Sequence, residues 1–346
     1  MAGYNFGPKA VFGSGNTTVD LTGPTVVVGD DNTVSGSSRR NFIGGSGNTI
    51  HEDVFDVTLI GAKNSQIKSG STRCAVIGGT GSQIYQGTSN GVILGGILNG
   101  MSAIGTMSHS VQLGGLLNNI NGGTSVVVGG QQNVVGAADY AAVIGSGNNV
   151  GLSVSKAWCF GASNTIGDSN FRIGFLSWNG SGSADAGYNL ATGYYPFASI
   201  HSSRVHGGGR LSSTDGSIQF HELLVACQTT NATETLMQTQ VPGAETSVKV
   251  RANSSFMFKA EIVARRTGTQ TESAAYEIVG CIKNDAGTTA LQGTITKTVI
   301  AEADSNWDVT AVANNTDDTL DIKVTGAAGK NINWVAKVSI VETNGA

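Results

Sequence analysis

One short motif returns at nearly constant spacing through the first half of the chain and limits the folds that this chain can adopt. It consists of two or three apolar residues followed by glycine, as in VVVG at 26–29, TLIG at 58–61 and AVIG at 75–78. Eleven such glycines are spaced 13 to 19 residues apart: Gly13, Gly29, Gly44, Gly61, Gly78, Gly95, Gly114, Gly129, Gly145, Gly161 and Gly174. A period of this length is typical of solenoids, in which each repeat stacks on the next because it cannot close a core alone.

Each repeat reads as two short strands and two turns. The apolar residues alternate faces with period two, and the glycine permits a sharp bend because it has no Cβ. Nine repeats carry an asparagine three or four residues later, and Ser82 replaces it in another: Asn16, Asn32, Asn48, Asn64, Asn99, Asn118, Asn133, Asn148 and Asn164. We expect these glycines and asparagines to be structural turn positions, with the asparagines tolerating left-handed backbone and forming a stacked polar ladder. Ligand binding along the asparagine column is the alternative.

About 16 residues per rung is few for one chain to enclose its own core, so we expect apolar faces that an obligate homotrimer covers. Eleven rungs about 4.8 Å apart give a rod of roughly 50 Å. Over residues 11–174 the pattern resembles the left-handed parallel β-roll in the heads of trimeric autotransporter adhesins. This resemblance implies a trimeric roll.

Glycine and charge divide the chain into two regions. Of the 50 glycines, 42 lie in residues 1–217, where Glu52 is the only glutamate. We expect a β-roll or β-helix repeat domain at 1–174, a junction or cap at 175–217, and a separate domain at 218–346. The aromatic residues of the junction are expected to plug the last rung, and a sugar-stacking platform is the alternative.

The last region reads as about nine short strands with turn signals every 8 to 14 residues, such as NDAGTT and AEADSN. Strands of this kind indicate an antiparallel β-sandwich or jelly roll. The whole chain is therefore expected to be all-β, with a parallel β-roll or β-helix followed by this sandwich.

Separated blocks of the same region, including HSSRVHGGG from 201, FMFKAEIVARRTG at 256–268 and INWVAKVSIVE at 332–342, resemble a C-terminal domain recurrent in phage and prophage tail-fibre-like proteins. The resemblance covers about residues 201–342. It implies a virion tail appendage, usually trimeric, assembled in the host cytoplasm beside other tail or baseplate proteins. Its expected target is a host cell-surface glycan or protein.

Receptor contacts are expected in the loops of the sandwich, because loops tolerate variation. The candidates are Arg266, Thr267, Gln270, Asn306, Trp307, Asn314 and Asn315. A net charge of −4 predicts no attraction to nucleic acid or to an anionic membrane. No apolar run approaches the roughly 18 residues of a membrane span, and the N-terminal segment lacks a signal-peptide pattern, so neither membrane insertion nor secretion is expected.

The sequence predicts no enzyme and no cofactor. Acids are scarce in the repeat, and the cluster HEDVFD at 51–56 is expected to be a solvated turn rather than a glycosidase carboxylate pair. HExxH, GxSxG and P-loop motifs are absent. Two other functions stay open: a glycan-depolymerising tailspike, and a structural capsid or baseplate decoration.

Two further groups of residues have a structural and a functional interpretation. His201 and His206 are expected to be exposed or hydrogen-bonded, while the alternative is a metal site on a three-fold axis. The four cysteines occur singly and are expected to be free thiols; a disulfide between Cys227 and Cys281 is the alternative.

Overall fold

The computed structural model describes residues 9–19, 21, 23–101, 109–121, 123–136, 140–151, 157–166, 171–175, 189–194, 196–200, 202–211, 216–239, 246–268 and 271–345. The chain forms two compact units, 1–169 and 170–346. The expected limit of the repeat domain, at residue 174, therefore lies just inside the second unit. In the described ranges every regular element is a strand. No helix that could cross a membrane is found among these residues.

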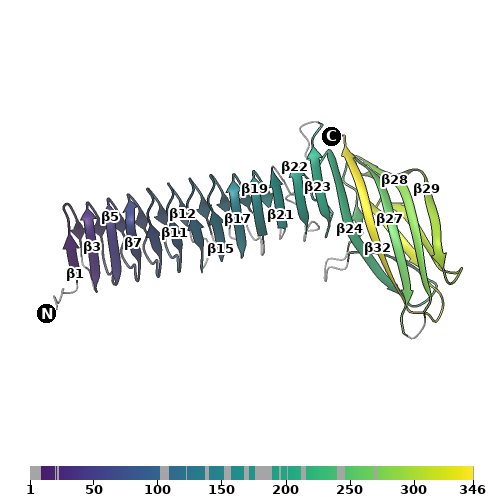
Figure 1. The fold of residues 1–346 in the computed structure, drawn as a ribbon, viewed down its shortest axis with the longest axis horizontal. Coiled ribbons are helices and arrows are strands. Elements are labelled where there is room, and N and C mark those ends of the chain that lie inside the picture. The colour runs from purple at the N-terminus through teal and green to yellow at the C-terminus, as the bar shows by residue number, and fades with distance from the viewer. Residues whose placement is uncertain are drawn as a thin grey trace. The chain divides into compact units, whose positions relative to one another are not determined.

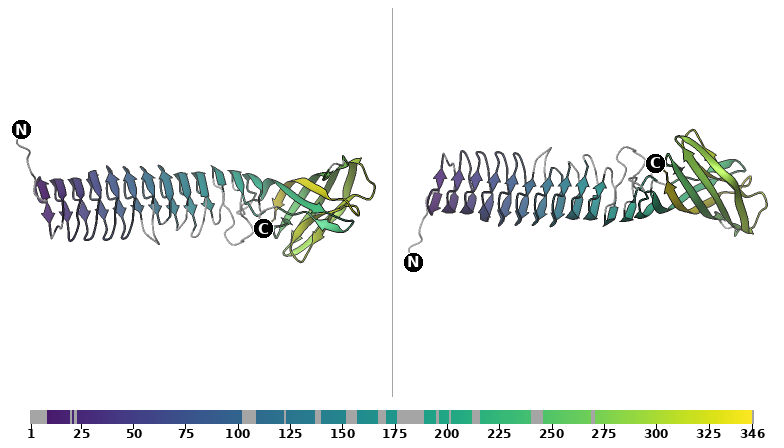
Figure 2. Two further views of the ribbon diagram at one scale, coloured as in Figure 1. Left: turned by 90° about the horizontal axis from the view of Figure 1, so that it is seen from below. Right: turned by 90° about the horizontal axis from the view of Figure 1, so that it is seen from above.

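The first unit is a parallel β-solenoid of ten stacked turns, each with one longer and one two-residue strand (Figures 1 and 2). The long-strand sheet contains β1 (Lys9–Phe12), β3 (Thr25–Asp30), β5 (Asn41–Ser46), β7 (Thr58–Lys63), β9 (Ala75–Ile77), β11 (Val92–Leu94), β13 (Val111–Leu113), β15 (Ser125–Val128), β17 (Ala141–Ser146) and β19 (Ala157–Ala162). The short-strand sheet contains β2 (Thr17–Thr18), β4 (Thr33–Val34), β6 (Thr49–Ile50), β8 (Gln66–Ile67), β10 (Gln83–Ile84), β12 (Gly100–Met101), β14 (Asn119–Ile120), β16 (Val134–Val135), β18 (Asn149–Val150) and β20 (Thr165–Ile166). The expected parallel repeat is confirmed.

The core of the solenoid lies between these two sheets. In the long-strand sheet Val76 pairs with Ile93 of the next turn, and both are fully buried. In the short-strand sheet Ile67 and Ile84 pair in the same way. Because side chains alternate along a strand, the residues on either side of each buried position point outward. The core is therefore narrow, with one or two buried side chains from most strands.

The second unit begins with parallel strands and continues antiparallel. β21 (Phe171–Phe175), β22 (Leu190–Tyr194) and β23 (Arg204–Gly209) pair in parallel, so the expected junction contains regular strands. An antiparallel sheet follows, in the order β23, β24, β32, β27, β28, β29. Its further strands are β24 (Ile218–Thr229), β27 (Ser254–Arg266), β28 (Ser273–Asp285), β29 (Thr288–Glu302) and β32 (Ile332–Asn344).

A smaller antiparallel sheet packs on the larger one. Its central strand β31 (Thr319–Thr325) pairs with β30 (Asp308–Asn314) and with the short strands β25 (Glu234–Leu236) and β26 (Val248–Lys249). One buried cluster joins both sheets and includes Trp307 and Trp334, whose ring centroids are 5.7 Å apart. The sandwich expectation is confirmed, and the jelly-roll alternative is not.

All four cysteines are free thiols, as expected. Cys227 packs against the core of the sandwich, whereas the neighbours of Cys281 on β28 show that its position points to the opposite face of the sheet. Burial raises the pKa of the Cys227 thiol to about 11. The alternative disulfide between them is therefore wrong.

Candidate functional site

Nine of the eleven glycines that we expected at turns have left-handed backbone, with φ between 62° and 121°. Gly44 does not: it lies inside β5, and Gly45 bends the chain instead, with φ of 132°. The register explains the correction. Gly45, and not Gly44, pairs with the bend glycine Gly29 of the previous turn. In the next turn Ile43 pairs with Leu59 but Gly45 pairs with Ala62, so β7 holds one extra residue, a β-bulge.

The asparagine ladder is real, and its members are buried. Asn48 donates through Nδ2 to Oδ1 of Asn32 at 3.1 Å, and Asn148 donates to Asn133 in the same way at 3.0 Å. Asn164 continues the ladder, with 2.7 Å to Asn148. These bonds satisfy amides that would be costly to bury unpaired.

Asn64 is not part of the ladder, and this expectation is wrong. The bulge in β7 shifts the column by one residue, so the N–H of Ser65 donates to Oδ1 of Asn48 at 3.0 Å. Asn64 is exposed and occupies the left-handed turn position, with φ of 52°. In the neighbouring turns this position belongs to the residue before the ladder asparagine, such as Asp31 before Asn32. The ladder asparagines themselves are therefore not the left-handed residues.

The outer surface of the long-strand sheet is apolar over many turns. Two rows of paired side chains run across consecutive strands: Ile60, Ile77, Leu94, Leu113, Val128, Ile144 and Phe160, and beside them Ala75, Val92, Val111, Val126, Ala142 and Trp158. Trp158 is 57% exposed and Ile60 is 45% exposed. We call these two rows the apolar outer face.

The outer surface of the short-strand sheet differs. Its paired outward positions include Thr49, Gln66 and Gln83, which are polar. An apolar surface that continues over seven strands, about 30 Å at the strand spacing, is larger than the scattered exposed residues of ordinary monomers. Such a continuous surface on the long-strand side of the solenoid marks an interaction site.

Three of the predicted receptor-contact residues lie together at one end of the sandwich. A chain of charges runs from Arg266 through Glu272 and Lys330 to Asp304, with N–O distances of 2.7, 2.7 and 2.6 Å. Asn306 donates to Asp304 at 2.8 Å. The backbone N–H of Thr267 donates to the carbonyl of Asn331, in the adjoining loop, at 2.8 Å. We call these residues the Lys330 cluster.

The charges of the Lys330 cluster neutralise one another. The hydrogen bond from Lys330, with help from Asn306, lowers the pKa of Asp304 to about 2. Two cations and two carboxylates thus fasten three loops, and the cluster holds no unpaired charge for a ligand. Gln270, which we expected in this group, lies outside the described residues.

Trp307 cannot be a receptor contact, and this expectation is wrong. Its side chain is 1% exposed and belongs to the core of the sandwich, under Lys330, whose Nζ is 5.9 Å from the ring centroid. A turn-like sequence, ADSNWD, suggested a loop, but the indole is the first residue of the inward-facing series that continues through Val309 and Ala311.

Asn314 and Asn315 lie at the other end of β30. Asn315 accepts the N–H of Thr289 at 2.6 Å and so links two turns. Asn314 borders a hollow of about 420 Å³, which we call the Asn314 pocket. Its lining is mostly polar: Ser199, Leu236, Gln238, Thr246, Ser247, Lys249, Asn314, Thr316, Asp317 and Thr319. Pockets that bind small ligands start at about 300 Å³, so this hollow is large enough for one.

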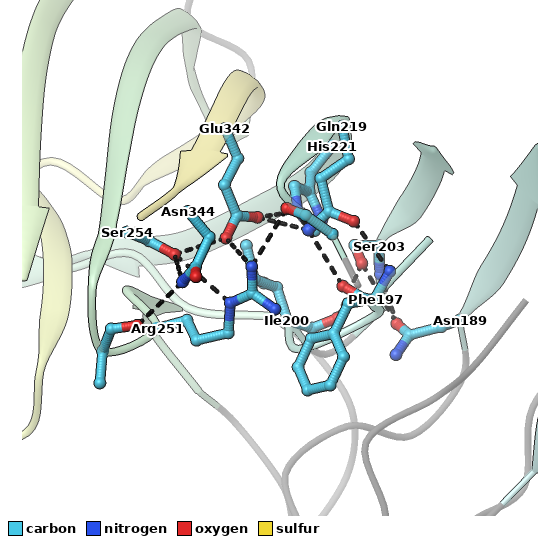
Figure 3. Close-up of polar contacts among 12 residues, drawn as sticks. Asn189, Phe197, Ile200, Ser203, Gln219, His221, Arg251, Ser254, Glu342 and Asn344 are labelled. Carbon is cyan, nitrogen blue, oxygen red and sulfur yellow. Dashed lines mark hydrogen bonds and ion pairs between the residues drawn. The ribbon is translucent and has the colours of Figure 1, made fainter. Parts of the chain in front are cut away.

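Sequence reasoning missed a buried polar network around Glu342 (Figure 3). Its carboxylate accepts from Ser254 at 2.7 Å and from Gln219 at 2.5 Å, and it pairs with His221 at 2.7 Å and Arg251 at 3.2 Å. Burial raises the pKa of Glu342, but the hydrogen bond and charge of His221, with Arg251 and Gln219, outweigh it and leave the pKa below its ordinary value.

The network has a structural role, because both Glu342 and His221 have fully buried side chains and no substrate can reach them. It also fixes the segment before β23: Gln219 exchanges two hydrogen bonds with the backbone of Phe197, whose ring lies 4.5 Å from the Arg251 guanidinium. A signal was present in the sequence. Glu342 occupies an inward position of β32, in the series of Val338 and Ile340, where an acid must be paired.

In the acidic turn at 51–56 the acids are exposed, as expected, but the apolar residue between them is buried. Asp56 pairs with Arg40 of the previous turn, and the hydrogen bond from Arg40 lowers the pKa of Asp56. Val54, between the acids, is fully buried. All three acids of this turn, Glu52, Asp53 and Asp56, are exposed.

Of the two histidines, His201 lies outside the described residues. His206 is on β23, with Nδ1 3.0 Å from the hydroxyl of Thr192 and its ring against Phe220. Among the described residues no three His, Cys, Asp or Glu side chains gather as metal ligands within one chain. The site shared by three chains stays a prediction.

Comparisons with known proteins give few matches. No family model matches the chain, and no curated protein matches it. Among solved structures, the tailspike gp49 of Acinetobacter baumannii bacteriophage Fri1, described as a capsular polysaccharide depolymerase, has a TM-score of 0.21 at 8% identity, over 92% of this chain and 63% of its own. The tailspike of Acinetobacter phage vB_ApiP_P1 has a TM-score of 0.18 at 8% identity, over 95% and 82%. That of Acinetobacter baumannii phage AM24 has 0.21 at 8%, over 94% and 59%.

The chain thus spans about three fifths of the length of the Fri1 and AM24 tailspikes. Similarity to tail fibres or to autotransporter adhesins finds no support in these comparisons. The expectation that the chain is not an enzyme is contradicted, because the matched structures are tailspikes and that of Fri1 is described as a depolymerase. We withdraw that exclusion. TM-scores near 0.2 carry no argument for a particular reaction.

Proposed function

We propose that this chain is a subunit of a homotrimeric bacteriophage tail appendage that engages a polysaccharide of the host cell surface. The observation that carries the proposal is the apolar outer face of the solenoid. A solenoid with one polar and one apolar outer surface is expected to bury the apolar surface against a partner. The rows on this face repeat at the rung spacing. Another copy of the same solenoid matches that spacing over the full length of the rows.

The number of copies rests on the two resemblances of the sequence, which both imply a trimer. Three copies give three identical sandwich units, and weak sites that act together gain effective concentration at a cell surface. A polysaccharide suits this mode of binding, because its repeating units offer many equal sites to one appendage.

Hydrolysis of the polysaccharide is a second candidate function, and one feature of the sandwich favours it. The Nδ2 of Asn314 donates to Oδ2 of Asp317 at 2.9 Å and to Oδ2 of Asp321 at 3.2 Å. These two oxygens are therefore at most about 6 Å apart, which keeps the two carboxylates within the upper limit of the separation that glycosidases use, about 9.5 Å.

The test has two parts. Antibodies against the purified chain should label the tails of the parent phage in electron micrographs, and the purified protein should block adsorption of that phage to its host. Labelling confined to capsids, with no block of adsorption, would instead assign the chain to the decoration proteins.

The second part separates binding from cleavage. Purified host polysaccharide is incubated with the protein, and release of reducing ends is measured for the wild type and for Asp317→Asn and Asp321→Asn. Loss of release in either variant, with adsorption still blocked, supports hydrolysis at this carboxylate pair. Release that persists in both variants would exclude the pair.

A further inference from the structure

The Asn314 pocket carries a positive charge that forms no ion pair with the described residues. Lys249 follows Val248 on β26, and its exposed ammonium donates to the backbone carbonyl oxygen of Asp317 at 2.6 Å. A carbonyl oxygen does not cancel a positive charge, and the described residues offer Lys249 no ion-pair partner. This differs from Lys330, which has two carboxylates. Two of the three N–H donors of Lys249 remain for a ligand.

A carboxylate is held in place on the same rim. The amide of Asn314 donates to Asp317, while its oxygen accepts the N–H groups of Thr316 and Asp317 at 3.0 and 3.1 Å. All hydrogen-bonding groups of Asn314 are thus used to position the turn. The other carboxylate oxygen of Asp317 is left to accept hydrogen bonds, and Asp317 is exposed.

The interior of the pocket adds hydroxyl groups. The Oγ of Ser199 is buried at the pocket wall and has no hydrogen-bond partner among the described residues. Leaving such a group unpaired costs free energy, which a ligand can recover. Ser247, Thr246 and Thr316 line the same hollow, and Leu236 is the only apolar side chain among its described lining residues.

We propose that the Asn314 pocket binds a hexuronic acid residue of a polysaccharide, a proposal that rests on the function proposed above. The sugar carboxylate faces Lys249, and ring hydroxyls donate to Asp317 and bond to Ser199. An ammonium without a carboxylate partner selects the acidic sugar, since a neutral hexose leaves that charge without a counter-ion. The closeness of Asp317 excludes a ligand that is anionic throughout, such as a phosphate.

The test uses two probes that differ in one group, methyl β-D-glucuronide and methyl β-D-glucoside. Binding of each to the full-length protein is measured by saturation-transfer NMR and titration. The proposal predicts that the glucuronide binds at least about tenfold more tightly at low salt, the size of one charge-assisted hydrogen bond, and that added salt removes most of this advantage. Equal affinities for the two probes would overturn it.

Two variants locate the site. Lys249→Gln should remove the preference for the glucuronide and leave the weak glucoside affinity unchanged. Lys283→Gln is the matched control, because Lys283 is a lysine on β28 that pairs with Asp285 instead; it should bind like the wild type. A preference that survives Lys249→Gln, in a protein with unchanged circular dichroism, would overturn the assignment.

The two proposals fail separately. If Lys249→Gln loses glucuronide binding and yet the chain is absent from phage tails, the pocket assignment stands and the tail-appendage function is wrong. If the wild type blocks phage adsorption and prefers no uronic acid, the tail-appendage function stands and the pocket assignment is wrong.

Discussion

In the solenoid most strands give one or two side chains to the core, such as Val76 in β9 or Ile84 in β10. In the sandwich a single core collects Trp334, Phe256 and Trp307 from both sheets. The solenoid core is therefore thin, and a second set of apolar side chains lies on its outer face. The sandwich closes its own core, whereas the solenoid depends on its turns and its ladder and, in the trimer that we propose, on a covering copy of the chain.

The stabilising contacts also differ in range. Asn148 bonds to Asn133, 15 residues earlier, and the same bond recurs from turn to turn. The contact between His221 and Glu342 joins residues that are 121 positions apart, and it is not part of a repeating series. A destabilising substitution in the solenoid should therefore affect the neighbouring turns as well. A substitution in the polar network around Glu342 should affect the sandwich alone.

The largest expected effect is on the sandwich. Glu342→Gln removes the charge that His221 and Arg251 face, and breaking a buried pair in this way costs about 3 to 5 kcal/mol of unfolding free energy. Urea unfolding followed by fluorescence of the buried Trp307 and Trp334 measures the change. Glu261→Gln, in an exposed pair with Lys259, is the control and should leave the midpoint unchanged. An equal shift in both variants would show that burial of the pair is unimportant.

The next largest effect distinguishes a bend glycine of the solenoid from a glycine inside a strand. At Gly145, φ is 121° and a Cβ would lie 1.8 Å from the carbonyl oxygen of Gly161, whereas at Gly44 the nearest atom would be 3.5 Å away. Gly145→Ala should cost about 2 kcal/mol or more, from left-handed strain and the clash. Gly44→Ala should change little, and thermal unfolding by circular dichroism compares the two. Equal midpoints would contradict the assignment of the turns.

A smaller effect comes from acid. The pKa of Glu342 in the folded protein lies below its ordinary value of 4.5, so its pairing stabilises the sandwich fully above that pH. As the pH falls below 4.5 this stabilisation is lost, because the unfolded chain binds the proton first. Unfolding free energies measured between pH 6 and 3 should fall, and the fall should be shallower in Glu342→Gln. Parallel curves for the two proteins would contradict this origin.

The smallest effect is a gain in stability. Gln112 is fully buried in the core of the solenoid, between Ile93 and Val127 of the neighbouring strands. The described residues give its amide no hydrogen-bond partner. Gln112→Val restores the pattern of its neighbours and should raise the unfolding free energy by about 1 kcal/mol. A loss of stability instead would mean that the amide is satisfied in the folded protein.

The repeated sequence motif predicted the parallel turns of the solenoid correctly. It misplaced single residues where the register between strands differed by one residue from the spacing of the motif. The glycine spacing predicts the parallel turns, because each repeat encodes its own bend. The bend lies at Gly45, which pairs with Gly29 of the previous turn, and the bulge in β7 moves the ladder position from Asn64 to Ser65. A one-residue insertion of this kind leaves the apolar pattern intact.

The site in the sandwich was harder to predict, because its members meet only through long-range pairing. Asn314 was expected at the surface and borders the pocket, but Lys249 joins it only because β26 pairs with β31. Trp307 was misplaced, since a tryptophan beside a turn can face either way until the sheet that it covers is known. Glu342 could have been found from its inward position on β32, although its partners could not.

The central claim to test is that copies of the chain cover the apolar outer face. Size-exclusion chromatography with light scattering on the full-length protein tests it, together with a double variant, Ile77→Asp and Ile144→Asp, that places charges in the exposed row. The account predicts a wild-type mass of about three times 35.3 kDa and a monomeric or aggregated variant. A folded, soluble wild-type monomer at micromolar concentration, unaffected by the two aspartates, would contradict it.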